Sequence, residues 1–330
     1  MEKGFKSIIG RADVKKQLNA AASSGRLANS YIISGEPGSG KKYIAKLFAM
    51  AVQCEAPEDG PCMECRSCRM ALSGNHPDII YITHEKPGSI GVDEVRKQLV
   101  EDVDIRPYCS KKKIYIVPDA SRMTVQAQNA LLKTLEQPPE YCVILLLSDN
   151  DDALLPTVRS RCVKISTGLL SDEEIQEYLI NEMLVPDYEA RLEAAFAQGN
   201  IGRARSLANA GDFQEKLQTS IVYLRNSKDM DAVSRIDTDK KIAADKQGIY
   251  VYLQIFRVWF RDVLYFKASS DPEGLVFRNE IKNIRKRAQT SSYEGLMKII
   301  DALGMAEDRL RANVNPELVL ELLFLKIGEN

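Results

Sequence analysis

The stretch from residue 35 to residue 42, GEPGSGKK, restricts the fold of this chain more than any other feature. It has the G-x-x-x-x-G-K spacing of a phosphate-binding loop. Such a loop works only between a β-strand and the first turn of a helix, where backbone N–H groups point at phosphate. The β-rich run SYIIS precedes it, and the amphipathic segment KKYIAKLFAMAVQ follows it. The sequence therefore predicts an α/β domain with a parallel sheet.

Short β-rich apolar runs alternate with helical patterns through the first half of the chain. The predicted strands lie at residues 30–35, 78–82, 113–117 and 142–147. Between them, apolar residues three or four apart predict helices over Val92 to Val103 and over Ala127 to Leu135. This alternation is typical of a doubly wound α/β domain, which we expect to end near Ser166.

Beyond Ser166 the strand signals stop. Ser171, followed three residues later by Glu174, predicts a capping box at the start of a helix, and glycines then separate short helices. From residue 212 onward the apolar positions follow long helical repeats. The clearest repeat is the stripe of Tyr252, Phe256, Trp259, Val263 and Phe266, which we interpret as the core of a helix bundle.

These patterns predict three domains. Residues 1–166 form the α/β domain, residues 167–211 a small helical lid, and residues 212–330 an all-helical domain. At 330 residues and 45% hydrophobic composition, the chain is long enough for each domain to have its own core.

The charges and the apolar runs narrow the class of protein. Lys and Arg number 45 against 46 Asp and Glu, so no overall basic field favours independent binding to nucleic acid. No apolar run is long enough for a membrane span, and the start MEKGFKSIIG lacks the apolar core of a signal peptide. We expect a cytoplasmic protein without a membrane partner.

The phosphate loop keeps most of its expected residues and loses one. Gly35, Gly38 and Gly40 would let the backbone curl, and Lys41 would reach the β and γ phosphates. Lys42 stands where a serine or threonine hydroxyl normally ligates Mg²⁺, and an ammonium group cannot coordinate a cation.

A second lesion concerns the same metal ion. The strand at 113–117 runs into Pro118, where the metal-binding aspartate of an ATPase would be expected, and Asp119 stands in the place of the water-activating glutamate. The sequence therefore predicts a site that no longer hydrolyses ATP. A glycine-rich turn that never bound nucleotide stays open as an alternative, and so does nucleotide binding without turnover.

Four of the seven cysteines cluster as C-x7-C-x2-C-x2-C. Thiols are kept reduced in the cytoplasm, and four thiolates at this spacing suit a tetrahedral zinc ion with no open coordination position. The sequence predicts a structural zinc module over residues 54–68, with the ligands Cys54, Cys62, Cys65 and Cys68. The remaining cysteines, which we expect to be ordinary core or sheet-edge residues, are Cys109, Cys142 and Cys162.

At this point the chain resembles a known family, the delta-prime subunits of the bacterial DNA polymerase III clamp loader, which are relatives of the gamma and tau ATPase subunits within the AAA+ class. The resemblance runs through most of the chain. It is most specific in the cysteine module, in AQNALLKTLEQPPEYCVILLLS at 127–148 and in LLPTVRSRC at 154–162. RANVNPELVLELLFLKI near the end is similar to the last helix of this family's collar domain, so the resemblance implies an oligomerisation role for residues 212–330.

The resemblance also implies a function. In that family a serine-arginine-cysteine triplet, matched here by Ser160, Arg161 and Cys162, supplies an arginine finger to ATP bound by the neighbouring subunit. Family members of this kind do not hydrolyse ATP themselves. They assist ATP-dependent loading of the sliding clamp onto primed DNA, with gamma or tau ATPase subunits and the delta subunit as partners. They contact the sliding clamp and primer-template DNA as part of the assembled complex.

Two other functions remain as alternatives. The first is an active ATPase subunit of the gamma and tau type, against which Lys42 and Pro118 speak. The second is a zinc-dependent DNA-binding regulator, which needs a recognition helix richer in Arg and Lys than the cysteine module provides. In the lid, the resemblance places Gly202 where active relatives carry a nucleotide-sensing arginine, and Arg203 is its neighbour, so a sensor role for Arg203 stays open.

Overall fold

The computed structural model describes residues 4–23, 27–84, 88–228, 230, 238, 240–245 and 248–329. By its contacts the chain forms two compact units. Unit 1 comprises Met1–Tyr178 and Gln198–Arg203, and unit 2 comprises Leu179–Ala197 and Ala204–Asn330. Parts of the stretch 167–211 belong to each unit, and the division into three domains stays a prediction.

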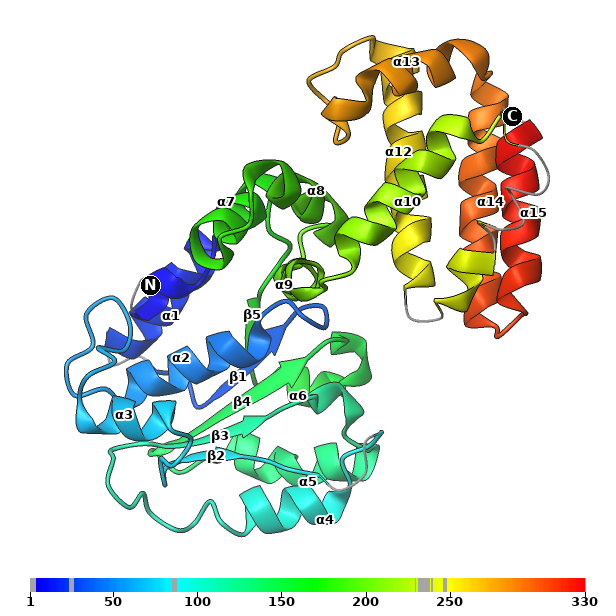
Figure 1. Ribbon diagram of the computed structural model, residues 1–330. Helices are drawn as coiled ribbons and strands as arrows, with labels where there is room; N and C mark the ends of the chain where they lie inside the picture. Colours follow the sequence, from blue (N-terminus) through cyan, green and yellow to red (C-terminus); the bar gives the residue numbers. More distant parts are fainter. Residues whose placement is uncertain are drawn as a thin grey trace. The chain divides into compact units, whose positions relative to one another are not determined.

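Unit 1 is built on a parallel five-stranded sheet with the order β2-β3-β4-β1-β5 (Figure 1). The strands are β1 Ser30–Ser34, β2 Ile79–Tyr81, β3 Lys113–Val117, β4 Cys142–Ser148 and β5 Val163–Ser166. The first four confirm the predicted strands. The fifth was not predicted, because only Ile165 of this edge strand is buried and no apolar run marks it.

Helices cover both faces of this sheet, which confirms the doubly wound α/β prediction. Side chains alternate along β1: Tyr31 and Ile33 pack with one set of helices, and Ile32 packs with the other. The first face carries α1 Ala12–Ser23 and α2 Lys41–Gln53. The second face carries α4 Val92–Val95, its π-helical continuation Arg96–Val100, α5 Val125–Glu136 and α6 Pro156–Arg159.

The predicted capping box is confirmed at the start of α7 Asp172–Met183. The backbone N–H of Ser171 donates to Glu174 Oε2 at 2.9 Å, and the backbone N–H of Glu174 donates to Ser171 Oγ at 3.2 Å. Each residue satisfies a backbone donor that the helix itself cannot. The next helices are α8 Asp187–Ala197 and α9 Ile201–Asn209.

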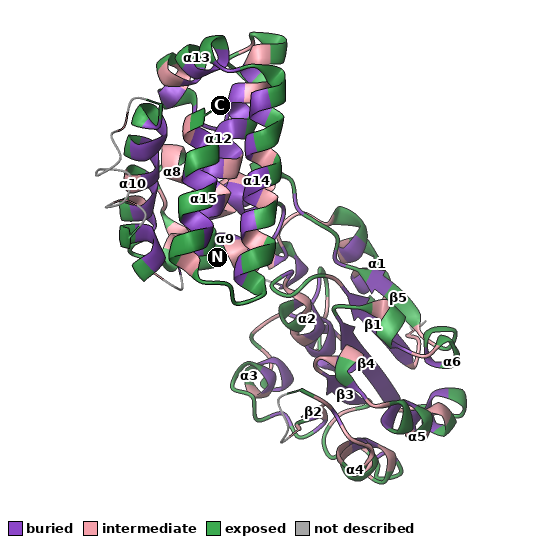
Figure 2. Ribbon diagram, turned by 90° about the vertical axis from the view of Figure 1, so that its right-hand side faces the viewer, coloured by how far each residue is buried: buried purple, intermediate pink, exposed green. Residues whose placement is uncertain are grey.

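In its described residues unit 2 consists of helices and connecting turns around a single core. Besides α8 and most of α9, it contains α10 Phe213–Asn226, α12 Ile249–Ser269, α13 Ile281–Thr290, α14 Tyr293–Arg311 and α15 Pro316–Glu329. The whole predicted stripe from Tyr252 to Phe266 is buried, and Figure 2 shows the buried faces of these helices turned toward one another.

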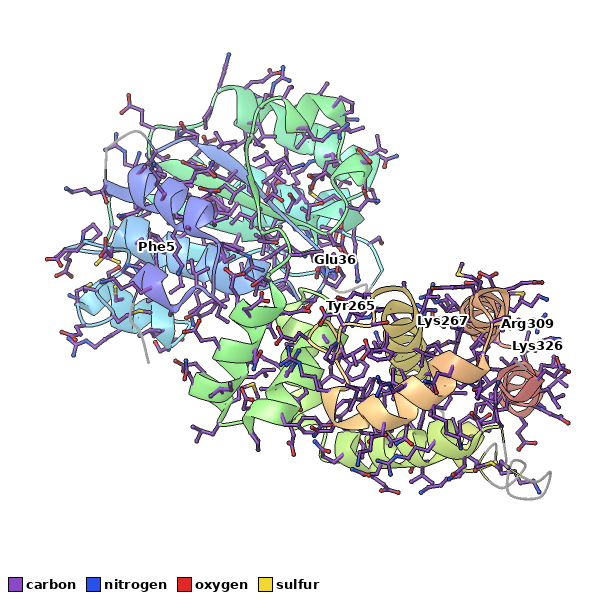
Figure 3. The ribbon with its side chains drawn as sticks, turned by 90° about the horizontal axis from the view of Figure 1, so that it is seen from above. Phe5, Glu36, Tyr265, Lys267, Arg309 and Lys326 are labelled. Atoms are coloured by element: carbon purple, nitrogen blue, oxygen red, sulfur yellow. The ribbon has the colours of Figure 1, made fainter. Side chains whose placement is uncertain are left out.

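Polar contacts also connect the helices of unit 2. Lys267 of α12, labelled in Figure 3, donates to the carbonyl of Ala288 in α13 at 2.8 Å. Its ammonium also lies 5.2 Å from the ring centre of Tyr293 in α14. Within the described ranges, no helix combines the length and the apolar composition that crossing a bilayer requires.

Candidate functional site

The phosphate loop lies where the sequence predicts it, between β1 and α2 at the carboxyl end of the sheet. Gly38 and Gly40 have φ angles of 83° and 88°, a region that glycine adopts without strain. Lys41 folds back on the loop, and its ammonium donates to the carbonyls of Gly35 and Glu36. The loop thus has the shape of a phosphate cradle, with its lysine bound by loop carbonyls.

The structure brings Lys42 close to Asp119, the residue after Pro118. Asp119, which follows β3, lies opposite the start of α2, and its Oδ2 is 3.7 Å from Lys42 Nζ. In an active site a metal ion would be bound by a hydroxyl at the position of Lys42 and by a carboxylate at the end of β3. Here Pro118 stands in the place of that carboxylate and has no side-chain oxygen, and the ammonium of Lys42 pairs with the next residue, Asp119.

A further carboxylate near this loop was missed from the sequence. Asp149 follows β4 and accepts a hydrogen bond from the Ser121 hydroxyl, which, with other groups, lowers the pKa of Asp149. Burial lowers the pKa of Lys41, although the charges of Asp149 and Asp119 act in the opposite direction. Since Asp149 is 30 residues from Asp119 and 107 residues from Lys42 in sequence, only the sheet order reveals that it lies near the loop.

Residues 198–203 pack directly on the phosphate loop. Asn200 is buried and caps α9, accepting from the backbone N–H groups of Gly202 and Arg203 at 3.1 Å each. The Asn200 amide donates to the carbonyl of Pro37 at 2.8 Å, and the Gly202 N–H donates to the carbonyl of Gly38 at 2.9 Å. The guanidinium of Arg203 donates to Gln198 Oε1 at 3.2 Å.

Arg161 lies at the amino end of the parallel strands, whereas the phosphate loop of its own chain lies at their carboxyl end. β5 is parallel to β1, with Tyr31 paired to Val163 and Ser34 paired to Ser166. The phosphate loop follows Ser34 at the carboxyl end, whereas Arg161 precedes β5 at the amino end. The strand alone separates these two levels by ~10 Å, so Arg161 faces a different surface of the unit.

The contacts of Arg161 hold its guanidinium in place. Nη2 lies 2.7 Å from Glu136 Oε1 at the end of α5, and Nη1 donates to the carbonyl of Thr157 at 2.8 Å. The side chain keeps 35% of its surface exposed. Of its two neighbours in the triplet, Ser160 is exposed, and Cys162 is half-buried against the core of the second sheet face.

The four clustered cysteines come together as predicted. Their Sγ atoms all lie within 4.8 Å of one another, and none is in a disulfide. A tetrahedral zinc ion with Zn–S distances of ~2.3 Å separates its sulfurs by ~3.8 Å, and Cys62 and Cys68 are 3.9 Å apart. These ligands join the end of α2 to α3 Arg66–Leu72.

Backbone donors favour the thiolate at Cys62, whereas burial raises the pKa of Cys54 and of Cys68. The N–H of Cys62 donates to Cys54 Sγ at 3.3 Å, and the N–H of Cys65 donates to Cys62 Sγ at 3.3 Å. N–H groups of Glu64 and Cys65 lower the pKa of Cys62 to about 7. The loop before it is tightly packed, since a Cβ at Gly60 would lie 2.6 Å from the backbone nitrogen of Phe5, a residue labelled in Figure 3.

The other cysteines differ from one another. Cys142 is buried in β4, which fits the core prediction, but Cys109 is exposed on a loop. The Sγ of Cys109 donates to Asp78 Oδ2 at 3.3 Å. Together with His76, these two residues form a second group of potential metal ligands among the described residues. It resembles a hydrogen-bond network more than a metal site, because Asp78 accepts the N–H groups of residues 108–110 and His76 Nδ1 accepts the N–H of Asp78.

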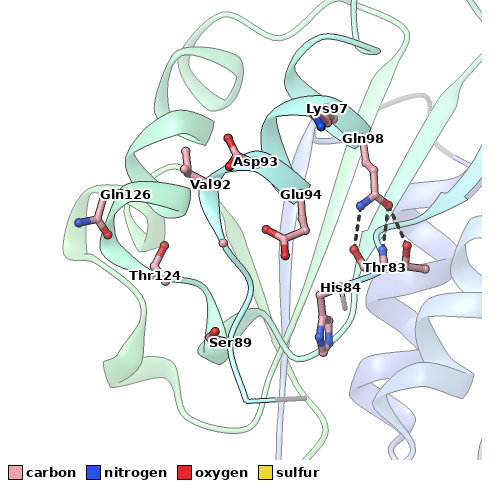
Figure 4. A pocket seen from close by; sticks show the side chains of 11 residues that line it. Thr83, His84, Ser89, Val92, Asp93, Glu94, Lys97, Gln98, Thr124 and Gln126 are labelled. Atoms are coloured by element: carbon pink, nitrogen blue, oxygen red, sulfur yellow. Dashed lines mark hydrogen bonds between the residues drawn. The ribbon is translucent and has the colours of Figure 1, made fainter. Parts of the chain in front are cut away.

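An open hollow of about 730 Å³ lies beside α4 and is lined mainly by polar side chains (Figure 4). Gln98 on its wall is bound by Thr83 through three hydrogen bonds of 2.7–3.1 Å. Asp93 and Glu94 add negative charge at the first turn of α4. None of the predicted site residues lines this hollow, so the candidate chemistry lies elsewhere in unit 1.

Comparison with known proteins gives two family matches. The family description "DNA polymerase III, delta subunit" matches residues 10–168, and its C-terminal counterpart matches residues 231–329. The chain is 29% identical to DNA polymerase III subunit delta' of Bacillus subtilis, over 96% of this chain and 95% of the relative. It is also 29% identical to subunit delta' of Pseudomonas aeruginosa, over 91% of each protein.

Subunits with other names match as well. The chain is 25% identical to DNA polymerase III subunit tau of Bacillus subtilis over 98% of its own length, but it spans only 61% of that relative. A solved structure of a DNA polymerase III gamma subunit-related protein from Thermotoga maritima matches with a TM-score of 0.49 and 20% identity, over 95% of this chain and 99% of the other.

The two family matches together take in most of the chain, and the delta' relatives match it nearly from end to end. The parallel P-loop-type sheet and the all-helical C-terminal region agree with the predicted AAA+ architecture. The chain therefore belongs to the family of delta' subunits of the DNA polymerase III clamp loader.

Proposed function

We propose that this clamp-loader subunit does not hydrolyse ATP and supplies Arg161 to ATP bound by a neighbouring subunit while the complex loads the sliding clamp onto primed DNA. The observation that carries the proposal is the position of Arg161 at the amino end of the strands, while its own phosphate loop lies at their carboxyl end. An arginine there can reach a phosphate only on another molecule. A guanidinium delivered in this way stabilises charge on the transferring phosphoryl group and contributes ~10³- to 10⁵-fold in rate.

The loss of intrinsic turnover has three supports in the site. Lys42 and Pro118 remove both protein ligands to the metal, and the ammonium of Lys42 pairs with Asp119 instead. The carboxylates of Asp149, Asp119 and Glu36 act on Lys41, so they offset part of the positive charge that this lysine would present to a triphosphate. Residues 198–203 also dock on the loop backbone. ATP binding without turnover stays open, because the backbone cradle is retained.

The cysteine cluster is proposed to hold one structural zinc ion. Cys54, Cys62, Cys65 and Cys68 supply four sulfurs that all lie within 4.8 Å of one another, and tetrahedral zinc separates its sulfurs by ~3.8 Å. Zinc bound by four thiolates has no open position for substrate, so its contribution is to fix the loop after α2 against α3.

The proposed partners are gamma or tau ATPase subunits and the delta subunit, with clamp and primer-template DNA met through the complex in the cytoplasm. Unit 2 offers a surface for subunit contacts in α14 and α15. Apolar side chains there are 41–52% exposed, and they belong to Met297, Met305, Leu318, Leu322 and Leu325. Exposed apolar side chains on adjoining helices favour burial against another subunit.

The alternative is an ATPase-active subunit of the gamma and tau type, which the match to subunit tau keeps under consideration. Reconstitution separates the two functions. Clamp loaders assembled from ATPase and delta subunits with and without this chain would be compared for clamp loading, and the isolated chain would be assayed for ATP turnover. Our proposal predicts that loading requires the chain and that the chain alone is inactive. Turnover by the isolated chain would favour the alternative.

A further inference from the structure

The ion pair between Glu136 and Arg161 joins two segments that are far apart in sequence. Glu136 is the last residue of α5, and Arg161 follows α6. The carboxylate oxygen lies 2.7 Å from Nη2, while Nη1 is bound by the carbonyl of Thr157 at 2.8 Å. The two terminal nitrogens of one planar group are therefore held from two different elements.

The position of Glu136 is unfavourable for its own helix. The last turn of a helix carries a partial negative charge, so a carboxylate there is destabilising unless a cation offsets it. Lys133 lies in the same last turn, but the ion pair that Glu136 makes among the described residues is with Arg161. The position of the carboxylate is therefore better explained by its ion pair with Arg161 than by a contribution to the stability of α5.

The guanidinium remains available while it is held. Arginine has five N–H donors in a rigid plane, and the contacts with Glu136, Thr157 and Ser160 leave others unused. Its side chain is 35% exposed. A group that is fixed in orientation but still open on one side loses less entropy when it meets a phosphate than a freely rotating side chain does.

We propose that Glu136 is a positioning residue for Arg161: it holds the guanidinium in the orientation from which it engages phosphate on the neighbouring subunit. This inference rests on the proposed function of Arg161. Glu136 acts through the arginine and does not touch nucleotide.

A second ion pair nearby serves as an internal control. Arg159 Nη1 lies 2.9 Å from Asp152 Oδ1, but the Asp152 side chain is 90% exposed. This pair also lies beside α6, and it is separate from the contacts of Arg161. Asp152→Ala therefore removes a carboxylate from a separate ion pair without changing the contacts of Arg161.

The test uses complexes reconstituted with the wild-type chain, Glu136→Ala, Glu136→Gln, Asp152→Ala, Arg161→Ala or the double variant Glu136→Ala/Arg161→Ala. The measured quantities are the DNA-stimulated ATPase rate, its KM for ATP, and assembly on the same samples. At the affected site we expect Glu136→Ala to lower kcat about two- to five-fold, the range of a partly exposed ion pair, with KM and assembly unchanged. Glu136→Gln, which keeps an oxygen acceptor, should recover part of the loss.

The double variant distinguishes a role through Arg161 from an independent one. We expect it to match Arg161→Ala alone, and we expect Asp152→Ala to match the wild type. An unchanged or higher rate with Glu136→Ala, while Arg161→Ala is impaired, would overturn the inference and leave the proposed function standing. The inference would also be overturned if Glu136→Ala lowered the ATPase rate by the same factor in the wild-type chain and in Arg161→Ala. No loss with Arg161→Ala would instead overturn the proposed function, and the inference with it.

Discussion

Gly202→Ala tests whether residues 198–203 dock on the phosphate loop. A Cβ added at Gly202 would lie 2.7 Å from both the Cα and the carbonyl oxygen of Gly38, closer than real Cβ contacts. Both neighbours are backbone atoms that no side-chain rotation can move away. The substitution must therefore shift one segment relative to the other.

Two opposing effects set the size of the change. Alanine is a better helix former than glycine by at most ~1 kcal/mol, which favours the variant because Gly202 lies in the first turn of α9. Overpacking costs ~1–3 kcal/mol, and weakening the Gly202–Gly38 hydrogen bond adds ~0.5–1.5 kcal/mol. The net expectation is a loss of ~0.5–4.5 kcal/mol in the free energy that holds the two segments together.

Hydrogen exchange measured by mass spectrometry on peptides covering residues 35–40 and 198–206 reports this local free energy. We expect faster exchange in both segments of Gly202→Ala. Gly211→Ala is the matched control, because a Cβ there meets no atom within 4 Å. It should leave exchange unchanged. Equal protection in Gly202→Ala and the wild type would refute the docking.

Three further expectations concern the metal, the nucleotide and pH. Protein purified without chelator should contain about one zinc per chain by elemental analysis, and Cys65→Ser should lower that content while the sheet stays folded; zinc-free wild type would exclude the site. The isolated chain should show no ATP turnover, and Lys42→Thr should not restore it, because Pro118 still lacks a carboxylate; a steady-state rate near ~1 s⁻¹ would contradict this. Burial, together with the charge of Glu189, raises the pKa of Glu193 from 4.5 to about 7. The folded state then keeps a proton that the unfolded chain releases, so the free energy of unfolding should fall as pH rises across that window. In urea unfolding at several pH values, Glu193→Gln should weaken the fall of the free energy of unfolding with pH. The same fall in Glu193→Gln and in the wild type would contradict this role of Glu193.

The sequence predicted those parts of the fold that local patterns specify. The glycines and Lys41 between an apolar strand and an amphipathic helix located the phosphate loop, and Ser171 with Glu174 located the start of α7. The cysteine spacing brought four sulfurs together because the ligands lie within one short segment. β5 escaped prediction, since an edge strand with one buried residue has no periodic signal.

Contacts between distant segments could not be predicted in this way. Asp149 reaches the phosphate loop because β4 lies between β3 and β1, an order that no local pattern encodes. Asn200 looks like an ordinary helix cap until its amide is seen to donate to Pro37. Glu136 and Arg161 are 25 residues apart, and only the packing of α5 beside α6 makes them neighbours.

The most direct test of the account compares clamp loaders reconstituted with the wild-type chain, Arg161→Ala, Arg161→Lys or Arg159→Ala, with assembly and zinc content checked on each sample. Arg161→Ala should assemble normally, since a partly exposed ion pair contributes little to stability. Its DNA-stimulated ATPase rate and clamp loading should fall in part, because one of several ATP sites would contact this subunit. Arg161→Lys should rescue poorly without the planar fork of the guanidinium, and Arg159→Ala should match the wild type. Equal rates for all four complexes would contradict the trans-acting role and leave the subunit with a purely structural one.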